Sequence, residues 1–322
     1  MINNKKGAME FSFAWIFAIV AGAIILSLAI YGVVKFMNMQ SSEIDAQTAK
    51  GIGVLLNPLE TGFEDSKRVL MEISTDTRIY TGCSNDSIFG RQTITTSQKL
   101  SGEWSSEGVN VPFYNRYIFS KNPVQGKDFY IFSKPLEMPF KVADLIYITS
   151  TEDKYCFVNP PDEIEDEIKI LIKKNTKKNE NFILENRRVN CPEESIQICF
   201  DTQTGCDMNV NRNLRRVQRS SETLWYEGDA LMYAAIFSSK KDYECQIDRL
   251  MNRTEQLYEI YQDKAEFILK KTNCDSELDI EVMRMINLLK NFQDSEDLSV
   301  IYDMSEEIDK KNKAYPECRL WY

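Results

Sequence analysis

The chain of 322 residues contains no histidine. It therefore has no Ser-His-Asp or Cys-His nucleophile pair, no histidine general base and no histidine metal ligand, which removes most hydrolase and zinc-enzyme chemistry. The phosphate-binding patterns G-x-x-x-x-G-K-[ST] and strand-borne G-x-G-x-x-G are missing too, and no two cysteines have the C-x-x-C spacing of zinc ribbons and thioredoxin-like sites. We therefore predict a protein that is not an enzyme and expect no catalytic residue, no cofactor and no metal ion.

Acidic residues outnumber basic ones, 49 against 39, which gives a formal net charge of −10. A chain of this charge is repelled by phosphate backbones and by anionic lipid headgroups, so we do not expect nucleic acid as a partner. The hydrophobic content of 43% is enough for a short anchor and one or two compact domains.

No residue from 11 to 34 carries a charge. A helix of this length spans a bilayer with some tilt, and Trp15 and Tyr31 lie near its ends, where amphipathic rings prefer the interface. A cleavable secretory signal would have a shorter apolar core, followed by a cut site of small residues. We therefore predict an uncleaved, single-pass membrane anchor over residues 1–40.

The orientation of the anchor follows from several weak signals. Lys5 and Lys6 precede the uncharged segment and Lys35 follows it, and this distribution of positive charge slightly favours a cytoplasmic N-terminus. The even number of cysteines and two glycosylation sequons, beginning at Asn85 and Asn252, favour the same orientation. We expect a cell-membrane protein with the bulk of its chain external.

Ala14, Ala18 and Gly22 recur every four residues within the anchor. This spacing puts three small side chains on one helix face, where a second helix can approach closely. Alanine and glycine are also common in any spanning helix. We expect the lipid bilayer as a partner, and a protein partner or self-association through this face of the anchor.

The run Lys5-Lys6-Gly7-Ala8-Met9-Glu10-Phe11, which leads directly into the apolar helix, resembles the N-terminus of archaeal class III signal peptide and type IV pilin-like proteins. The resemblance implies that a short basic leader is removed in the region of Lys6 and Gly7, and that Glu10 sets the register in a helical filament. The rest of the chain resembles an uncharacterised archaeal family of membrane-anchored ectodomains, which implies a setting and no activity.

The outer part of the chain divides by its patterns into three units. Residues 41–61 have helical spacing and predict a stalk, and residues 62–239 have short runs rich in β-formers, which predict a β-rich ectodomain. Within it we expect a hairpin of residues 114–119 and 129–132, and a buried strand over residues 142–149. One inserted helix follows Asn159-Pro160-Pro161, with Ile164, Ile168 and Leu171 on its apolar face.

Three groups of side chains in the ectodomain have both a structural and a functional interpretation. The acidic residues that begin the inserted helix compensate its dipole, or they form a calcium site or an acid/base pair. Four arginines are solvated on a loop or edge strand, or dock to an acidic partner. Three aromatics pack across strands, or stack on sugars. These groups are, in order, Asp162, Glu163, Glu165 and Asp166; Arg212, Arg215, Arg216 and Arg219; and Trp104, Tyr114 and Tyr117.

Residues 240–322 change to helical periodicity. Apolar positions predict a long helix from Ile247 to about Ile268, a second around residues 278–292 and a third around residues 298–308. We expect these three to form an antiparallel bundle beside the β-rich part. The predicted fold class is therefore α+β, with an N-terminal transmembrane helix and stalk, a β-rich ectodomain with one inserted helix, and a C-terminal antiparallel three-helix bundle.

One disulfide follows from the helix lengths. Cys245 and Cys274 lie at opposite ends of the long helix, roughly 43 Å apart, which is far beyond the separation of about 4–7 Å that a disulfide allows. The second and third helices bring Cys318 back toward Cys274, so we predict a Cys274–Cys318 bridge. Sequence does not rank the pairings of the other six cysteines, which are Cys83, Cys156, Cys191, Cys199, Cys206 and Cys245.

We expect a single-pass, membrane-anchored, externally exposed protein with a structural or interaction role. The first alternative is a pilin-like subunit of a type IV-type surface filament. A second, less favoured alternative is a surface hydrolase that uses carboxylates only, because two-carboxylate glycosidase chemistry needs no histidine.

Overall fold

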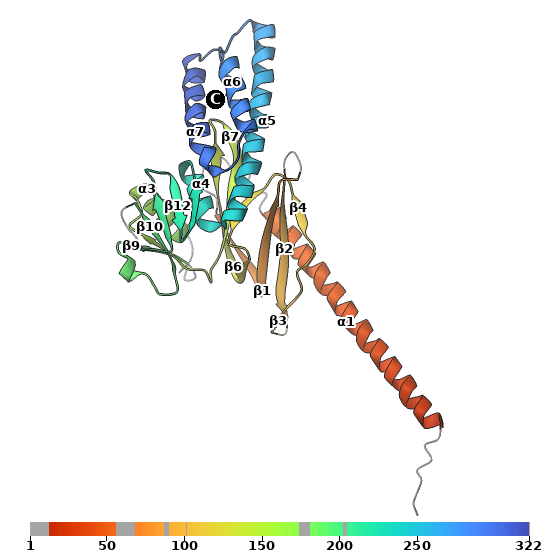
Figure 1. Cartoon of the computed structure of the whole chain (residues 1–322). Helices are drawn as coiled ribbons and strands as arrows, with labels where there is room; N and C mark the ends of the chain where they lie inside the picture. Colours follow the sequence, from red (N-terminus) through yellow and green to blue (C-terminus); the bar gives the residue numbers. More distant parts are fainter. Residues whose placement is uncertain are drawn as a thin grey trace, which may run out of the picture.

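The computed structural model describes residues 13–55, 68–86, 90–100, 102–173, 181–201 and 205–321. A long helix, α1 (Phe13–Leu55), leads into a body with two β-sheets, and three helices follow at the C-terminus (Figure 1). The fold is therefore mixed α+β, with an N-terminal apolar helix, a β-rich body and C-terminal helices. The division of the chain at residues 40, 61 and 239 stays a prediction.

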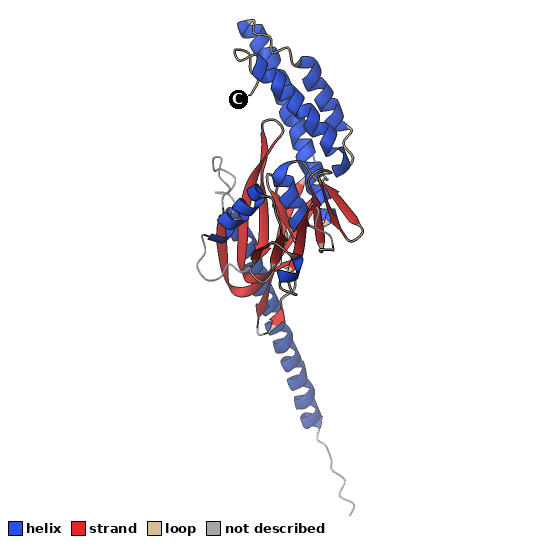
Figure 2. Cartoon of the chain, turned by 90° about the vertical axis from the view of Figure 1, so that its left-hand side faces the viewer, coloured by secondary structure: helices blue, strands red, loops and turns tan. Residues whose placement is uncertain are grey.

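Helix α1 extends away from the body for most of its length (Figure 2). Its segment Trp15–Val33 has a mean hydropathy of 2.5, and none of it is buried inside the structure. By length and composition this segment is sufficient to cross a membrane, although an N-terminal signal sequence has the same properties. Near the other end of α1, Ile52 is buried against the first sheet.

The first sheet has strand order β3-β2-β1-β6-β7-β5, and β4 also pairs with β2. Its pairs are antiparallel apart from the parallel pair β5–β7. The strands are β1 (Arg68–Ser84), β2 (Arg91–Leu100), β3 (Glu103–Trp104), β4 (Val111–Phe113), β5 (Tyr117–Ser120), β6 (Val124–Glu137) and β7 (Lys141–Ser150).

This sheet curls until its two sides meet. Three strands lie between β2 and β5, which would place them about 19 Å apart in a flat sheet. Yet the backbone N–H of Ile118 in β5 donates to Gln92 Oε1 in β2 at 3.4 Å, and the hydroxyls of Thr81 in β1 and Ser120 in β5 are 3.1 Å apart. We call the line where β5 meets β1 and β2 the seam. The curled sheet encloses a cluster of Ile52, Met71, Ile79, Ile94, Ile118, Val124, Phe129, Ile131, Ile146 and Ile148.

The predicted hairpin of residues 114–119 and 129–132 is wrong, whereas the strand over residues 142–149 is confirmed as β7. Strand β6 pairs with β1 on one side and with β7 on the other. Neither side of β6 is left for β5, which instead adds in parallel to the free side of β7.

The second sheet has strand order β13-β12-β11-β10-β8-β9. The pairs among β8 to β11 are parallel, and β11, β12 and β13 are antiparallel neighbours. The inserted helix is confirmed as α3 (Asp162–Lys173), which connects β8 to β9 and buries Ile164, Ile168 and Leu171. The strands are β8 (Tyr155–Val158), β9 (Phe182–Glu185), β10 (Ile196–Phe200), β11 (Met208–Asn211), β12 (Arg216–Arg219) and β13 (Glu222–Trp225), with a short helix η1 (Arg188–Asn190) before β10.

A second helix, α4 (Gly228–Phe237), lies in the region where the sequence predicts only one. Every residue from Ala230 to Phe237 is buried. A helix that is apolar all round has no polar face and therefore no 3.6-residue period, so periodicity does not reveal it. It packs on the aromatic face of the first sheet, where Tyr147 Oη donates to the carbonyl of Ala230 at 2.7 Å.

The C-terminal helices are α5 (Lys240–Thr272), α6 (Asp279–Lys290) and α7 (Leu298–Ala314), with a short helix η2 (Ser295–Asp297) before α7. One hydrophobic cluster runs from the first sheet through the second and along these helices to Trp321. The chain end is fixed, because Asn312 Nδ2 donates to the carbonyl of Trp321 at 2.9 Å and Asn312 Oδ1 accepts from the N–H of Leu320 at 2.8 Å. The helices and both sheets therefore share one core.

Candidate functional site

All eight cysteines are paired, in four disulfides. The structure joins Cys274 to Cys318, whose Cα atoms are 5.7 Å apart. This bridge ties the C-terminal segment to the end of α5. The pairs that the sequence left open are Cys83–Cys245, Cys156–Cys191 and Cys199–Cys206.

The predicted membrane contact lies on α1. Ala14, Ala18 and Gly22 are consecutive positions of one helix face by their spacing, and Ala18 and Gly22 are exposed. A Cβ atom added at Gly22 would meet nothing within 4 Å. The predicted processing residues Lys6, Gly7 and Glu10 lie outside the described residues.

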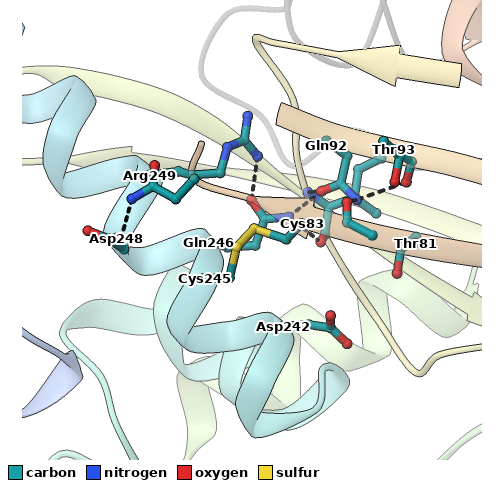
Figure 3. The surroundings of a disulfide bond; sticks show 12 residues. Thr81, Cys83, Gln92, Thr93, Asp242, Cys245, Gln246, Asp248 and Arg249 are labelled. Carbon is teal, nitrogen blue, oxygen red and sulfur yellow. Dashed lines mark hydrogen bonds between the residues drawn. A yellow bond between two sulfur atoms is a disulfide. The ribbon is translucent and has the colours of Figure 1, made fainter. Parts of the chain in front are cut away.

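Helix α5 covers the seam of the first sheet with long polar side chains (Figure 3). Gln246 Nε2 donates to Gln92 Oε1 and to the carbonyl of Ile118. Arg249 Nη1 donates to the carbonyl of Arg116 and to Gln246 Oε1 at 2.9 and 2.7 Å, and its Nη2 donates to the carbonyl of Tyr114 at 2.9 Å. These bonds satisfy backbone groups along β5 and the segment before it, on the side that has no strand neighbour.

Arg249 is fully buried. Burial lowers the pKa of its guanidinium. The guanidinium lies 4.7 Å from the centroid of the Tyr117 ring, and it donates to two main-chain carbonyls. Carbonyl dipoles and the face of an aromatic ring therefore offset the cost of burying this charge.

The Cys83–Cys245 bridge crosses the same junction, and the two sequons meet beside it. Asn85 Nδ2 donates to Asp248, and Asn252 Nδ2 donates to Asn85 Oδ1 at 3.3 Å. Burial raises the pKa of Asp248, and the hydrogen bond from Asn85 opposes that rise. No sequence signal predicts this contact, because the two asparagines belong to segments far apart in the chain.

The arginine stretch has a structural role that the sequence analysis missed. Arg219 donates to the carbonyls of Ser238 and Ile236 at 2.6 and 3.2 Å and also to that of Ala235, so it caps the C-terminus of α4. Arg212 Nη2 pairs with Asp201 at 2.7 Å. The prediction of solvated arginines is therefore wrong for Arg219, whereas Arg212 remains exposed to solvent. A charge pattern in sequence does not show which carbonyls lie within reach.

Arg215 links two carboxylates across a groove of about 550 Å³ between β13 and α7. Its Nη1 lies 2.7 Å from Glu227 and 3.9 Å from Asp303. Burial raises the pKa of Glu227, whereas the hydrogen bond and charge of Arg215 lower it. An arginine between the two carboxylates holds them as ion-pair partners, which fits a structural link better than an acid and base pair.

The aromatic residues considered for sugar stacking occupy different environments. Tyr117 is a core residue, 1% exposed, so the stacking interpretation is wrong for it. The guanidinium of Arg78 covers the ring of Trp104 at 3.9 Å, and Tyr114 is 54% exposed.

The acidic residues at the start of α3 lie in its first turn, where Lys169 pairs with Glu165 at 2.6 Å. Among the described residues, no group of three or more His, Cys, Asp or Glu side chains is placed to hold a metal ion.

Comparison with known proteins gives no match for this chain among protein-family models, curated proteins or solved structures.

We predict that Arg249→Met lowers the free energy of unfolding by about 2–4 kcal/mol, because it leaves the buried carbonyl of Arg116 and the partly buried carbonyl of Tyr114 without this donor. Denaturant unfolding of the full chain in detergent measures the loss. Arg284→Met, at an exposed position of α6, is the matched control, with an expected change within about 0.5 kcal/mol. Equal stability of the two variants would contradict the role assigned to Arg249.

Asp248 generates a prediction of pH dependence. Its pKa in the folded protein is raised by burial, so the native state binds a proton more tightly than the unfolded chain, where an aspartate titrates near about 3.9. Lowering the pH through the window between the raised pKa and that value therefore stabilises the native state. The melting temperature of the wild type relative to Asp248→Asn should rise as the pH falls from about 7 to about 4. A difference that stays constant or shrinks would show that burial does not control this carboxyl.

Proposed function

We propose that this chain is a single-pass, membrane-anchored protein with a cytoplasmic N-terminus and an external, disulfide-bonded body that serves a structural or interaction role. The observation that carries the proposal is the combination of one unburied apolar helix near the N-terminus with a body in which all eight cysteines are paired. Disulfides form and persist in oxidising compartments, outside the cytoplasm.

Two features of the body support a structural or interaction role. Two of its polar clusters, at the seam and around Arg215, are engaged in hydrogen bonds and ion pairs that hold elements together. The C-terminal helices lie at the end of the body away from the N-terminus of α1 (Figure 2). In our proposal these helices form an antiparallel three-helix bundle at the membrane-distal end, where a partner on the cell surface reaches them first.

Protease protection tests the orientation. We expect protease added to intact cells to cleave the body, and we expect the fragments to separate on a gel only after reduction, because Cys83–Cys245 links segments that are 162 residues apart. A cytosolic marker protein in the same cells serves as the control for membrane integrity. A body that stays protected until the membrane is broken would contradict the external location.

A pilin-like filament subunit is the second candidate, and the shape of α1 favours it. This one helix has 43 residues, with its apolar part unburied and Ile52 packed into the sheet. A helix that projects from a β-rich head supplies a face along which copies of the chain can pack side by side. Ala18 and Gly22 lie exposed on this helix.

The N-terminus distinguishes the two candidates. If the chain is an uncleaved anchor, mass spectrometry of protein from its native membrane should find an N-terminus at Met1 or Ile2. A mature N-terminus close to Lys6 or Gly7, together with recovery of the chain in sheared surface filaments, would replace the anchor proposal with the filament proposal.

A further inference from the structure

The outer face of the second sheet is covered over β8 and β10 and open over β11 and β12. Directly opposite residues of antiparallel strands share a face, and Val210, Val217 and Leu224 point into the core. The alternate residues Asn209 and Gln218 therefore share the outer face, as do Asn211 with Arg216 and Arg216 with Trp225. On β8 and β10 the same sheet has a small cluster of its own, built from Val158 and disulfide-bonded Cys156, Cys191 and Cys199.

A groove of about 450 Å³ lies over the open part of this face, on β11 and β12. Most of its lining residues are polar, with Val210 and Cys206 as the apolar members. We call it the outer-face groove, and its other lining residues are Asp201, Asp207, Asn209, Asn211, Arg216, Gln218 and Ser220. The groove between β13 and α7 that contains Arg215, which we call the Arg215 groove, adjoins it. Arg216 lines the outer-face groove, Trp225 lines the Arg215 groove, and the Arg216 guanidinium lies 5.9 Å from the Trp225 ring centroid.

Polar side chains of the outer-face groove include one unpartnered atom and two exposed groups. Among the described residues, Asn209 Oδ1 is buried and has no hydrogen-bond partner. Gln218, which lies on β12, and Ser220, which follows that strand directly, are exposed. A buried amide oxygen without a partner is costly, but Asn209 Oδ1 has almost no surface that a ligand could reach. The groups that a ligand meets in the groove are therefore the exposed side chains of Gln218 and Ser220.

The charge balance of the groove selects the ligand. Asp201 is paired with Arg212, and Arg216 offsets Asp207, whose Oδ2 accepts from the N–H of Gln197 at 2.8 Å. A nearly neutral groove, beside an Arg215 groove that holds Glu227 and Asp303, attracts no polyanion. Its scarce apolar lining also gives the apolar side chains of a peptide little to pack against. Amide, guanidinium, carboxylate and hydroxyl groups together supply both the donors and the acceptors that a neutral polyhydroxylated ligand needs.

We propose that the outer-face groove on β11 and β12 binds a neutral oligosaccharide. The inference deepens the proposed interaction role and rests on it for the source of the ligand, a glycan of the cell surface. Gln218 and Ser220 supply hydrogen bonds to sugar hydroxyls, and Arg216 and Trp225 mark the end through which a longer glycan continues into the Arg215 groove.

Binding by the purified full chain tests the proposal independently of its location in the cell. The chain is kept in a zwitterionic detergent, because sugar-headed detergents would compete. The probes are arrayed linear hexasaccharides of glucose, mannose, galactose and N-acetylglucosamine, with heparin and oligolysine as charged comparisons. We expect binding to at least one neutral hexasaccharide, with a Kd that changes less than about twofold between about 0.1 M and about 1 M salt.

Gln218→Ala should weaken that binding about fivefold, the effect of one lost hydrogen bond, and Asn209→Ala, which changes the lining of the groove, should weaken it as well. Asn287→Ala, which removes an exposed amide on α6 outside the groove, is the matched control and should bind as the wild type. Gln218 is exposed, so its variant remains informative if Asn209→Ala fails to fold. No binding to any neutral hexasaccharide, unchanged binding by Gln218→Ala, or binding of heparin or oligolysine alone would overturn the proposal. Failure here with an external body in the protease test would leave the proposed location intact.

Discussion

The unpaired side of β5 is the constraint on which the rest of the structure depends. A sheet that curls without completing its hydrogen-bond ladder leaves buried backbone groups at the seam, and each unsatisfied group costs about 1–3 kcal/mol. Gln92, Gln246 and Arg249 meet that demand with side-chain amides and a guanidinium. Because two of these three residues belong to α5, the helix cannot leave the sheet without exposing the seam. The position of α5 in turn fixes α6, α7 and the C-terminal Trp321, which share its core.

The disulfides add covalent links to these contacts, and they differ in the length of chain that each one closes. Cys83–Cys245 joins residues 162 positions apart and lies at the junction that the buried polar cluster holds, so covalent and polar links act on one contact. The other three bridges close shorter spans of 35, 7 and 44 residues, on the second sheet and at the chain end. In the chain-entropy model a longer loop restricts the unfolded chain more. The bridge that spans the whole body is therefore the one that does most to disfavour its unfolded state.

The sequence predicted what depends on local periodicity or on length. Helices α3, α5, α6 and α7 follow from apolar spacing, and the Cys274–Cys318 pairing follows from the separation that α5 imposes on Cys245 and Cys274. Helix α4 was missed because a segment buried on all sides has no period. The hairpin was wrong because strand neighbours are decided by the closure of the sheet, which depends on contacts between residues as far apart as Gln92 and Gln246. The outer-face groove was invisible for a similar reason, since no local signal shows that strands β11 and β12 lack a cover.

The two sheets of the body differ in how their polar side chains are used. On the first sheet, buried amides and an arginine are engaged by one another and by backbone carbonyls. On the second sheet, Arg212, Arg215 and Arg219 are engaged by Asp201, Glu227 and the end of α4, whereas Arg216 remains on the outer face beside Asn209 and Gln218. Both sheets contact the same aromatic core, in which Phe132 of the first and Phe182 of the second pack against Phe237. A ligand on the second sheet would therefore be held at a fixed position relative to Ile52, where α1 enters the body.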